Sequence, residues 1–125
     1  MSKQATHDSV IYYSKEDSCW IAHSLITDQI GTGNSITESL ADLMRAIQQI
    51  LAIAINDRDV EVLRSAPAEI QDIAKRAKHL PGEIYEVAYK MVHGNWPQEF
   101  TVVEKENGDK EPLVTQLPEF EYALA

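Results

Sequence analysis

Residues 32–43 read Thr-Gly-Asn-Ser-Ile-Thr-Glu-Ser-Leu-Ala-Asp-Leu (TGNSITESLADL), and this stretch marks where a short strand ends and a long helix begins. Ser35 and Glu38 have the Ser-x-x-Glu spacing of a capping box, in which each side chain accepts a hydrogen bond from the other residue's backbone N–H. The two glycines before the cap, Gly31 and Gly33, are followed neither by the third glycine of a dinucleotide loop nor by Gly-Lys-Ser/Thr. The stretch therefore predicts a helix start and not a phosphate site.

The helix that begins at Ser35 is predicted to run to about Ala54, because apolar residues recur there at helical spacing. These residues are Ile36, Leu40, Leu43, Met44, Ile47, Ile50, Leu51 and Ala54. The opposite side is filled by Thr37, Ser39, Asp42, Arg45, Gln48 and Gln49. Near its end the run Ile50–Ile55 (ILAIAI) is apolar on nearly all sides, so it needs cover from more than one direction. A sheet covers one side, and a later helix pair or a second subunit is expected to cover the other.

This apolar run supplies most of the predicted interface, to which Ile50, Ile53 and Ile55 belong. Trp96 is added because it lies next to Pro97 in a predicted loop, where an exposed aromatic side chain can anchor a partner. The other reading of Trp96 is that it packs back on the core. We expect a homodimer or a higher homo-oligomer.

Three strands are predicted before the helix, and two helices and two strands after it. The early strands are residues 9–14, 18–27 and 29–33; the later helices are 65–80 and 83–92, and the later strands are 100–105 and 112–117. A tight turn at Leu80-Pro81-Gly82 joins the later helices into a hairpin. Residues 56–64 are an edge strand or a short helix, and the helix is favoured.

The predicted fold is α+β: a small antiparallel sheet with one long helix packed on it, a helical hairpin, and a C-terminal strand pair. The corresponding units are residues 1–55, 56–94 and 95–125, which together form one compact domain of 125 residues.

Composition and charge narrow the classes of partner and the cellular environment that fit this chain. The net charge of −9 opposes general binding to nucleic acid, where neutralisation of phosphates supplies most of the affinity, and it suits a basic protein partner. Cys19 is the only cysteine, which fits a reducing cytoplasm and excludes an internal disulfide. The longest strongly apolar run, ILAIAI, is too short to span a bilayer, so no membrane association is expected.

No catalytic, cofactor-binding or metal-binding residue is predicted, and the chain is expected not to be an enzyme. Cys19 and His23 are four residues apart on a predicted strand, roughly 13 Å, which is too far for a nucleophile and its base. The four histidines lack the spacing that places two metal ligands on one helix face. The carboxylates form no pair in an apolar setting that would raise a pKa.

One basic cluster leaves an alternative open. Lys75, Arg76 and Lys78 lie near the end of a predicted helix, where cations complement the helix dipole. They could instead contact nucleic acid in a helix-turn-helix unit, which makes a transcriptional regulator the alternative function. The following helix, Glu83–Val92, offers no arginine or asparagine for base edges, which favours the dipole interpretation.

Residues 9–54 resemble the HicB-like antitoxin domain, in which a strand pair precedes a Gly-Asx-Thr-x-x-Glu-Ala-Leu segment that leads into a helix. The matching residues here are Gly33-Asn34-Ser35-Ile36-Thr37-Glu38-Ser39-Leu40. Trp20-Ile21-Ala22 corresponds to the second strand of that family, which often carries an apolar-Val-Ala element. Ser35 replaces threonine and Ser39 replaces alanine, and both replacements keep the capping and helical character of the motif.

The resemblance implies an α+β fold similar to double-stranded-RNA-binding folds, and a binding protein instead of an enzyme. HicB-like antitoxins mask a small mRNA-cleaving HicA toxin, usually as dimers or tetramers, and often carry a C-terminal DNA-binding domain. Residues 56–125 show neither a helix-turn-helix nor a ribbon-helix-helix pattern. We therefore expect an antitoxin-related interaction protein, in the form of a stand-alone relative or with a basic toxin-like partner.

Overall fold

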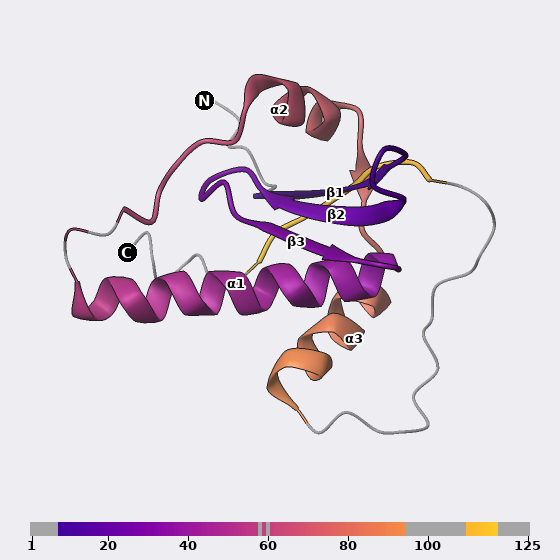
Figure 1. Cartoon of the computed structure of the whole chain (residues 1–125). Helices are drawn as coiled ribbons and strands as arrows, with labels where there is room; N and C mark the ends of the chain where they lie inside the picture. The colour runs from indigo at the N-terminus through magenta and orange to yellow at the C-terminus, as the bar shows by residue number, and fades with distance from the viewer. Residues whose placement is uncertain (1–7, 58, 60, 95–109, 118–125) are drawn as a thin grey trace, which may run out of the picture.

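The computed structural model describes residues 8–57, 59, 61–94 and 110–117, and the fold is α+β (Figure 1). Its described elements are β1 (Ser9–Ser14), β2 (Cys19–Ser24), β3 (Ile30–Gly33), α1 (Ile36–Asn56), α2 (Ala68–Lys75), β4 (Lys78–His79), α3 (Gly82–His93) and β5 (Leu113–Thr115). The strands form one five-stranded sheet in the order β3-β2-β1-β5-β4. Neighbouring strands are antiparallel except β4 and β5, which are parallel.

Helices cover both faces of this sheet. Figure 1 shows α1 along one face with α3 beside it, and α2 on the opposite face. The core lies between the sheet and α1, where side chains of both are buried together with Ala88 of α3 and with Leu117, which follows β5. Its buried members are Ile11, Trp20, Ala22, Leu40, Ala41, Leu43, Met44, Ile47, Ala88 and Leu117.

Two glycines let α1 lie directly on β3. Gly31 and Gly33 pair with Ala22 and Trp20 in the sheet, so both face the core side on which α1 packs. A Cβ atom on Gly31 would lie 2.6 Å from the carbonyl oxygen of Ser39 and still closer to the backbone nitrogen of Leu43. A Cβ on Gly33 would lie 2.6 Å from the Glu38 side chain. The glycine spacing therefore serves close packing of a helix on a strand backbone.

The predicted helix start is confirmed, with one change in its hydrogen bonds. The Ser35 hydroxyl accepts a hydrogen bond from the backbone N–H of Glu38 at 3.1 Å. The Glu38 carboxylate accepts from the N–H of Asn34 at 3.0 Å, one residue before the expected donor. Together the two bonds satisfy backbone donors at the strand–helix junction, and the helix continues two residues beyond its predicted end.

A buried carboxylate joins the first strand to the end of the described chain. Asp8 accepts hydrogen bonds from the backbone N–H of Leu117, at 3.1 and 3.0 Å to its two oxygens, and from the Ser9 hydroxyl at 2.9 Å. Its own backbone N–H donates to Thr115 at 3.2 Å. These bonds hold Leu117, which is 1% exposed, in the core between the sheet and α1.

Several predictions for the second half of the chain are wrong, because β5 recruits the residues that were assigned to a helix. The predicted helix over 65–80 ends at Lys75, and the backbone N–H groups of Lys78 and Leu80 donate to Pro112 and Val114 at 3.1 and 2.8 Å. β4 thus separates α2 from α3, which pack against β1 and α1, so they form no hairpin (Figure 1). The parallel β4–β5 pair also makes the sheet mixed instead of purely antiparallel.

The predicted short helix over 56–64 is also absent from the described part of that segment. Beyond the end of α1 its described residues have no regular secondary structure. The N–H groups of Arg64 and Ala66 donate to Ile26 and Leu25 at 2.8 and 3.1 Å, which leads the chain from the α1 face toward α2. The predicted strand over 112–117 contains β5, whereas the one over 100–105 lies outside the described residues, and so does Trp96. Among the described helices, none is long and apolar enough to cross a membrane.

The glycine contacts predict opposite effects of two Gly→Ala substitutions. Gly31→Ala should lower the free energy of unfolding by about 3 kcal/mol, because the new methyl group meets backbone atoms that cannot move independently. Gly82→Ala, at the start of α3 with open space around it, should change stability by less than about 1 kcal/mol, in the stabilising direction. Urea unfolding of both variants measures the difference, and equal midpoints would contradict the packing argument.

Asp8 should stabilise the fold although it lies far in sequence from its partner. Asp8→Ala leaves the N–H of Leu117 buried without this acceptor and should cost about 2–4 kcal/mol of unfolding free energy. Asp8→Asn keeps one acceptor oxygen and should lose less. Guanidinium unfolding of the two variants tests this order, which fails if the alanine variant is as stable as the asparagine variant.

Candidate functional site

Helix α1 is longer than the sheet that it covers. Its 21 residues span about 31 Å, whereas the six residues of β2 span about 20 Å and the four of β3 fewer. Figure 1 shows the C-terminal part of α1, in magenta, running past the ends of the strands. Ile53 is 52% exposed and Ile55 is 82% exposed on this overhanging part. The sheet and α3 therefore leave the apolar end of α1 partly uncovered.

A shallow groove lies where this part of α1 passes the start of the edge strand β3. The groove has a volume of about 440 Å³. Its walls are Asp28, Gln29 and Ile30 on the strand side and Ala46, Gln49, Ile50 and Ile53 on the helix side. Ile30 is 50% exposed, and Ala46 leaves room between the larger side chains. Polar and apolar side chains share the lining of this concave surface, which makes it a candidate binding site.

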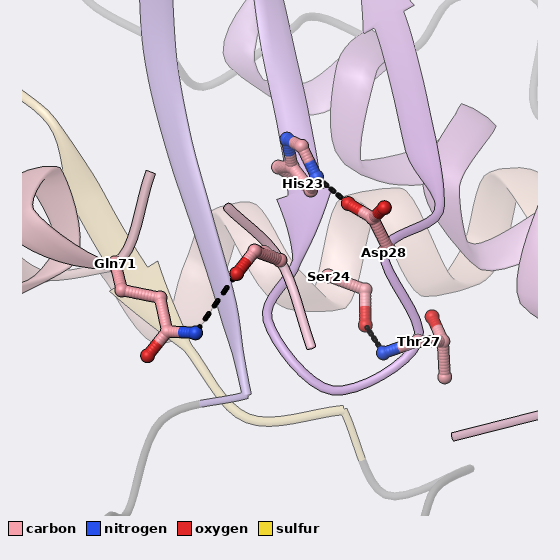
Figure 2. Close-up of polar contacts among 6 residues, drawn as sticks. His23, Ser24, Thr27, Asp28 and Gln71 are labelled. Carbon is pink, nitrogen blue, oxygen red and sulfur yellow. Dashed lines mark hydrogen bonds and ion pairs between the residues drawn. The ribbon is translucent and has the colours of Figure 1, made fainter. Parts of the chain in front are cut away.

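The carboxylate in this groove is held by a buried histidine. The Nε2 atom of His23 lies 2.6 Å from Oδ1 of Asp28, and Figure 2 shows the two side chains facing one another. Because an ionised carboxylate only accepts hydrogen bonds, Nε2 carries the proton. The other ring nitrogen, Nδ1, is buried without a hydrogen-bond partner among the described residues. Asp28 has a backbone φ of 60°, a left-handed conformation that aspartate tolerates better than most residues.

The end of α1 next to the groove is acidic. The C-cap residue is Asp57, no basic residue lies in the last turn, and Asp59 and Glu61 follow on exposed positions. The C-terminus of a helix already carries about half a negative charge from aligned peptide dipoles. Carboxylates at these positions add to that charge, and Arg58 and Arg64 in the same stretch of sequence offset part of it.

The edge strand itself is partly closed to strand pairing. The backbone N–H of Thr32, in the middle of β3, donates to the Asp42 carboxylate of α1 at 2.9 Å. A partner strand that paired along this edge would need that donor. The groove is therefore more accessible to a partner than the edge of the strand.

The three residues of the basic cluster come from two different elements. Lys75 ends α2 and lies 3.5 Å from Asp72, whereas Lys78 belongs to β4 and lies 2.6 Å from Glu111. Arg76 is the exposed C-cap residue of α2. The three side chains come from a helix end and a strand, so they do not line the face of a recognition helix.

Of the predicted interface residues, Ile50 and Ile53 line the groove and Ile55 is exposed on the same part of α1. Sequence reasoning missed Asp28 and Ile30. The signal for Ile30 was its place in a short predicted strand that carries two glycines, where an apolar side chain has few neighbours to cover it. Asp28 had no comparable signal, because its role depends on a contact with His23 across the strand turn.

Among the titratable groups, Tyr12 has a raised pKa, chiefly because burial disfavours the charged phenolate, with further increases from Glu69, Asp17 and Cys19. It is therefore neutral near pH 7. The described residues contain no group of three or more histidine, cysteine, aspartate or glutamate side chains that could hold a metal ion.

Comparison with protein-family models, with curated proteins and with solved structures finds no significant match to this chain.

The backbone at Asp28 predicts a difference between two substitutions that both remove the His23 hydrogen bond. Asp28→Ala must hold a Cβ-bearing residue without a polar side chain in the left-handed region, which glycine adopts freely. Asp28→Ala should therefore be less stable than Asp28→Gly by about 1 kcal/mol. Thermal and urea unfolding of both variants provide the measurement, and a more stable alanine variant would contradict the prediction.

Proposed function

We propose that this chain is a non-enzymatic interaction protein of the cytoplasm, related to HicB-like antitoxins, and that it binds a protein partner at the groove beside α1. The observation that carries the proposal is the apolar surface left open by the overhanging end of α1. Ile30, Ile53 and Ile55 are each at least half exposed there. The order of three strands followed by a capped helix agrees with the HicB-like and double-stranded-RNA-binding type of fold that the resemblance implies.

Covering this surface would be energetically favourable. A fully buried isoleucine contributes about 1.5–3 kcal/mol relative to an exposed one, so the exposed part of each of these side chains represents about 1 kcal/mol or more. Several such contributions at the centre of an interface supply much of the free energy of association. Polar contacts around the centre then make the association specific.

Two kinds of partner fit this proposal. A basic toxin-like protein complements the net charge of −9. A second copy of the chain would cover the same apolar side chains and give the homodimer that the ILAIAI sequence suggests. In both cases the chain acts by masking a surface, and none of its residues is assigned a catalytic role.

Two substitutions to serine at exposed positions separate groove binding from binding elsewhere. Ile53→Ser removes an exposed apolar side chain from the groove, whereas Tyr89→Ser removes an exposed one from α3. We expect tagged wild-type chain and the Tyr89→Ser variant to co-purify with the same partner, or to show the same dimer mass by light scattering. For the Ile53→Ser variant, the amount of captured partner should fall at least about fivefold, or the dissociation constant of the dimer should rise by the same factor.

The control is the stability of the free chain. Because Ile53 is half exposed in the free chain, Ile53→Ser should leave its unfolding midpoint close to that of the wild type. A wild-type chain that is monomeric at tens of micromolar and captures no protein would contradict the proposal. Undiminished association of the Ile53→Ser variant would contradict the placement of the site.

A further inference from the structure

We propose that the partner presents a basic amphipathic segment, whose apolar side chains lie against Ile30, Ile50 and Ile53 and whose lysine or arginine binds the Asp28 carboxylate. This inference rests on the proposed function and names the chemistry of the partner. Of the two partners that fit the proposed function, a basic protein and a second copy of the chain, the charges around the groove favour the basic protein.

Asp28 is suited to receive a cation. It lines the groove with its side chain 28% exposed, so it is reachable but partly desolvated. His23 occupies Oδ1, and Figure 2 shows the other carboxylate oxygen directed away from the histidine. A carboxylate has lone pairs for more than one donor, so the second oxygen can accept from a partner ammonium or guanidinium group.

The isoleucines of the groove strengthen such a contact. The aliphatic stem of a lysine or arginine can lie along the neighbouring isoleucines while its charged head meets Asp28. Covering the groove removes water from the pair, and an ion pair screened less by water is stronger than one on an open surface. The site is therefore suited to bind a cation that lies next to apolar side chains, and a basic amphipathic segment presents that pattern.

The acidic end of α1 favours the basic segment over a second copy. Residues 57–64 carry Asp57, Asp59 and Glu61 against Arg58 and Arg64, and α1 has no basic residue in its last turn. Two copies joined by the ends of their α1 helices would bring these like charges and two like helix dipoles together. A basic segment instead meets complementary charge both at Asp28 and at the helix end.

His23 is a positioning residue in this arrangement. Its buried ring fixes Oδ1, and with it the direction of the free oxygen and the left-handed corner before Ile30. Glutamine at this position can place an amide donor near the same point as Nε2, whereas leucine cannot. The two substitutions therefore separate loss of the hydrogen bond from loss of ring packing.

The test uses a synthetic amphipathic leucine–lysine helix and a twin with glutamine in place of lysine, titrated into the full chain by fluorescence anisotropy. Asp28→Asn keeps a residue that tolerates the left-handed backbone but removes the charge. Glu16→Gln removes the same charge from an exposed turn outside the groove. We expect the lysine helix to bind the wild type and Glu16→Gln alike and Asp28→Asn about three- to tenfold more weakly.

The same titration covers the remaining variants. The glutamine twin should bind more weakly than the lysine helix and should not distinguish Asp28→Asn from the wild type. His23→Gln should bind the lysine helix within about twofold of the wild type, and His23→Leu should resemble Asp28→Asn. Unfolding midpoints above the titration temperature show that each variant is folded when it is measured.

The outcomes separate this inference from the proposed function. If Ile53→Ser loses binding while Asp28→Asn matches Glu16→Gln, the groove is the site but the cation contact at Asp28 is wrong. If Ile53→Ser and Asp28→Asn both bind like the wild type, the groove itself is wrong. A wild-type dimer that excludes the lysine helix and dissociates in Ile53→Ser would overturn the basic segment in favour of a second copy.

Discussion

The contact between α1 and the bare backbone of β3 is the constraint on which the rest of the structure depends. Gly31 and Gly33 present no side chain on the core side of the strand, so the helix backbone approaches to a distance at which any Cβ would collide. Ser39 is fully buried on the helix side of this contact, where a larger side chain would hold the two elements apart. A helix seated this closely on a strand has little freedom to slide or rotate.

The groove follows from that seating. Because the capped start of α1 lies under β3, the whole excess length of the helix must emerge at the other end, past the start of the same strand. The side chains that a longer sheet would cover are then left beside the edge strand, where Ile30 meets Ile50 and Ile53. The groove is thus a consequence of helix length relative to strand length, combined with a fixed point of contact.

Long-range backbone pairing closes the remainder of the fold. Asp8 holds the N–H of Leu117, and β5 lies between β1 and β4 so that strands from the two ends of the chain are neighbours. The passage of residues 61–67 from the end of α1 to the other face positions α2 opposite α1. These pairings join segments that are far apart in sequence, and ordering the intervening chain opposes them entropically. Buried hydrogen bonds such as those of Asp8 help to offset that cost.

Local signals predicted the first half of the chain well. The strands before α1, the cap at Ser35 and the long helix all depend on interactions within a few residues, which sequence spacing reports directly. The same reasoning assigned Thr37 and Ser39 to the polar side of α1, although both are buried. Helical periodicity shows which residues share a face of α1. How much of the circumference of α1 is buried depends on how closely β3 approaches it.

The second half shows where local signals fail. The apolar spacing of residues 70–80 is helical, yet Lys78 and Leu80 pair with β5 because that strand offers unsatisfied carbonyl groups. The sequence by itself determined the class of fold, the capped helix, the excess of negative charge and the apolar run at the end of α1. Only the tertiary structure decided that β4 separates the later helices and that His23 orients Asp28 beside this run. Those contacts join residues across strand turns and between distant segments, and no spacing rule along the chain encodes them.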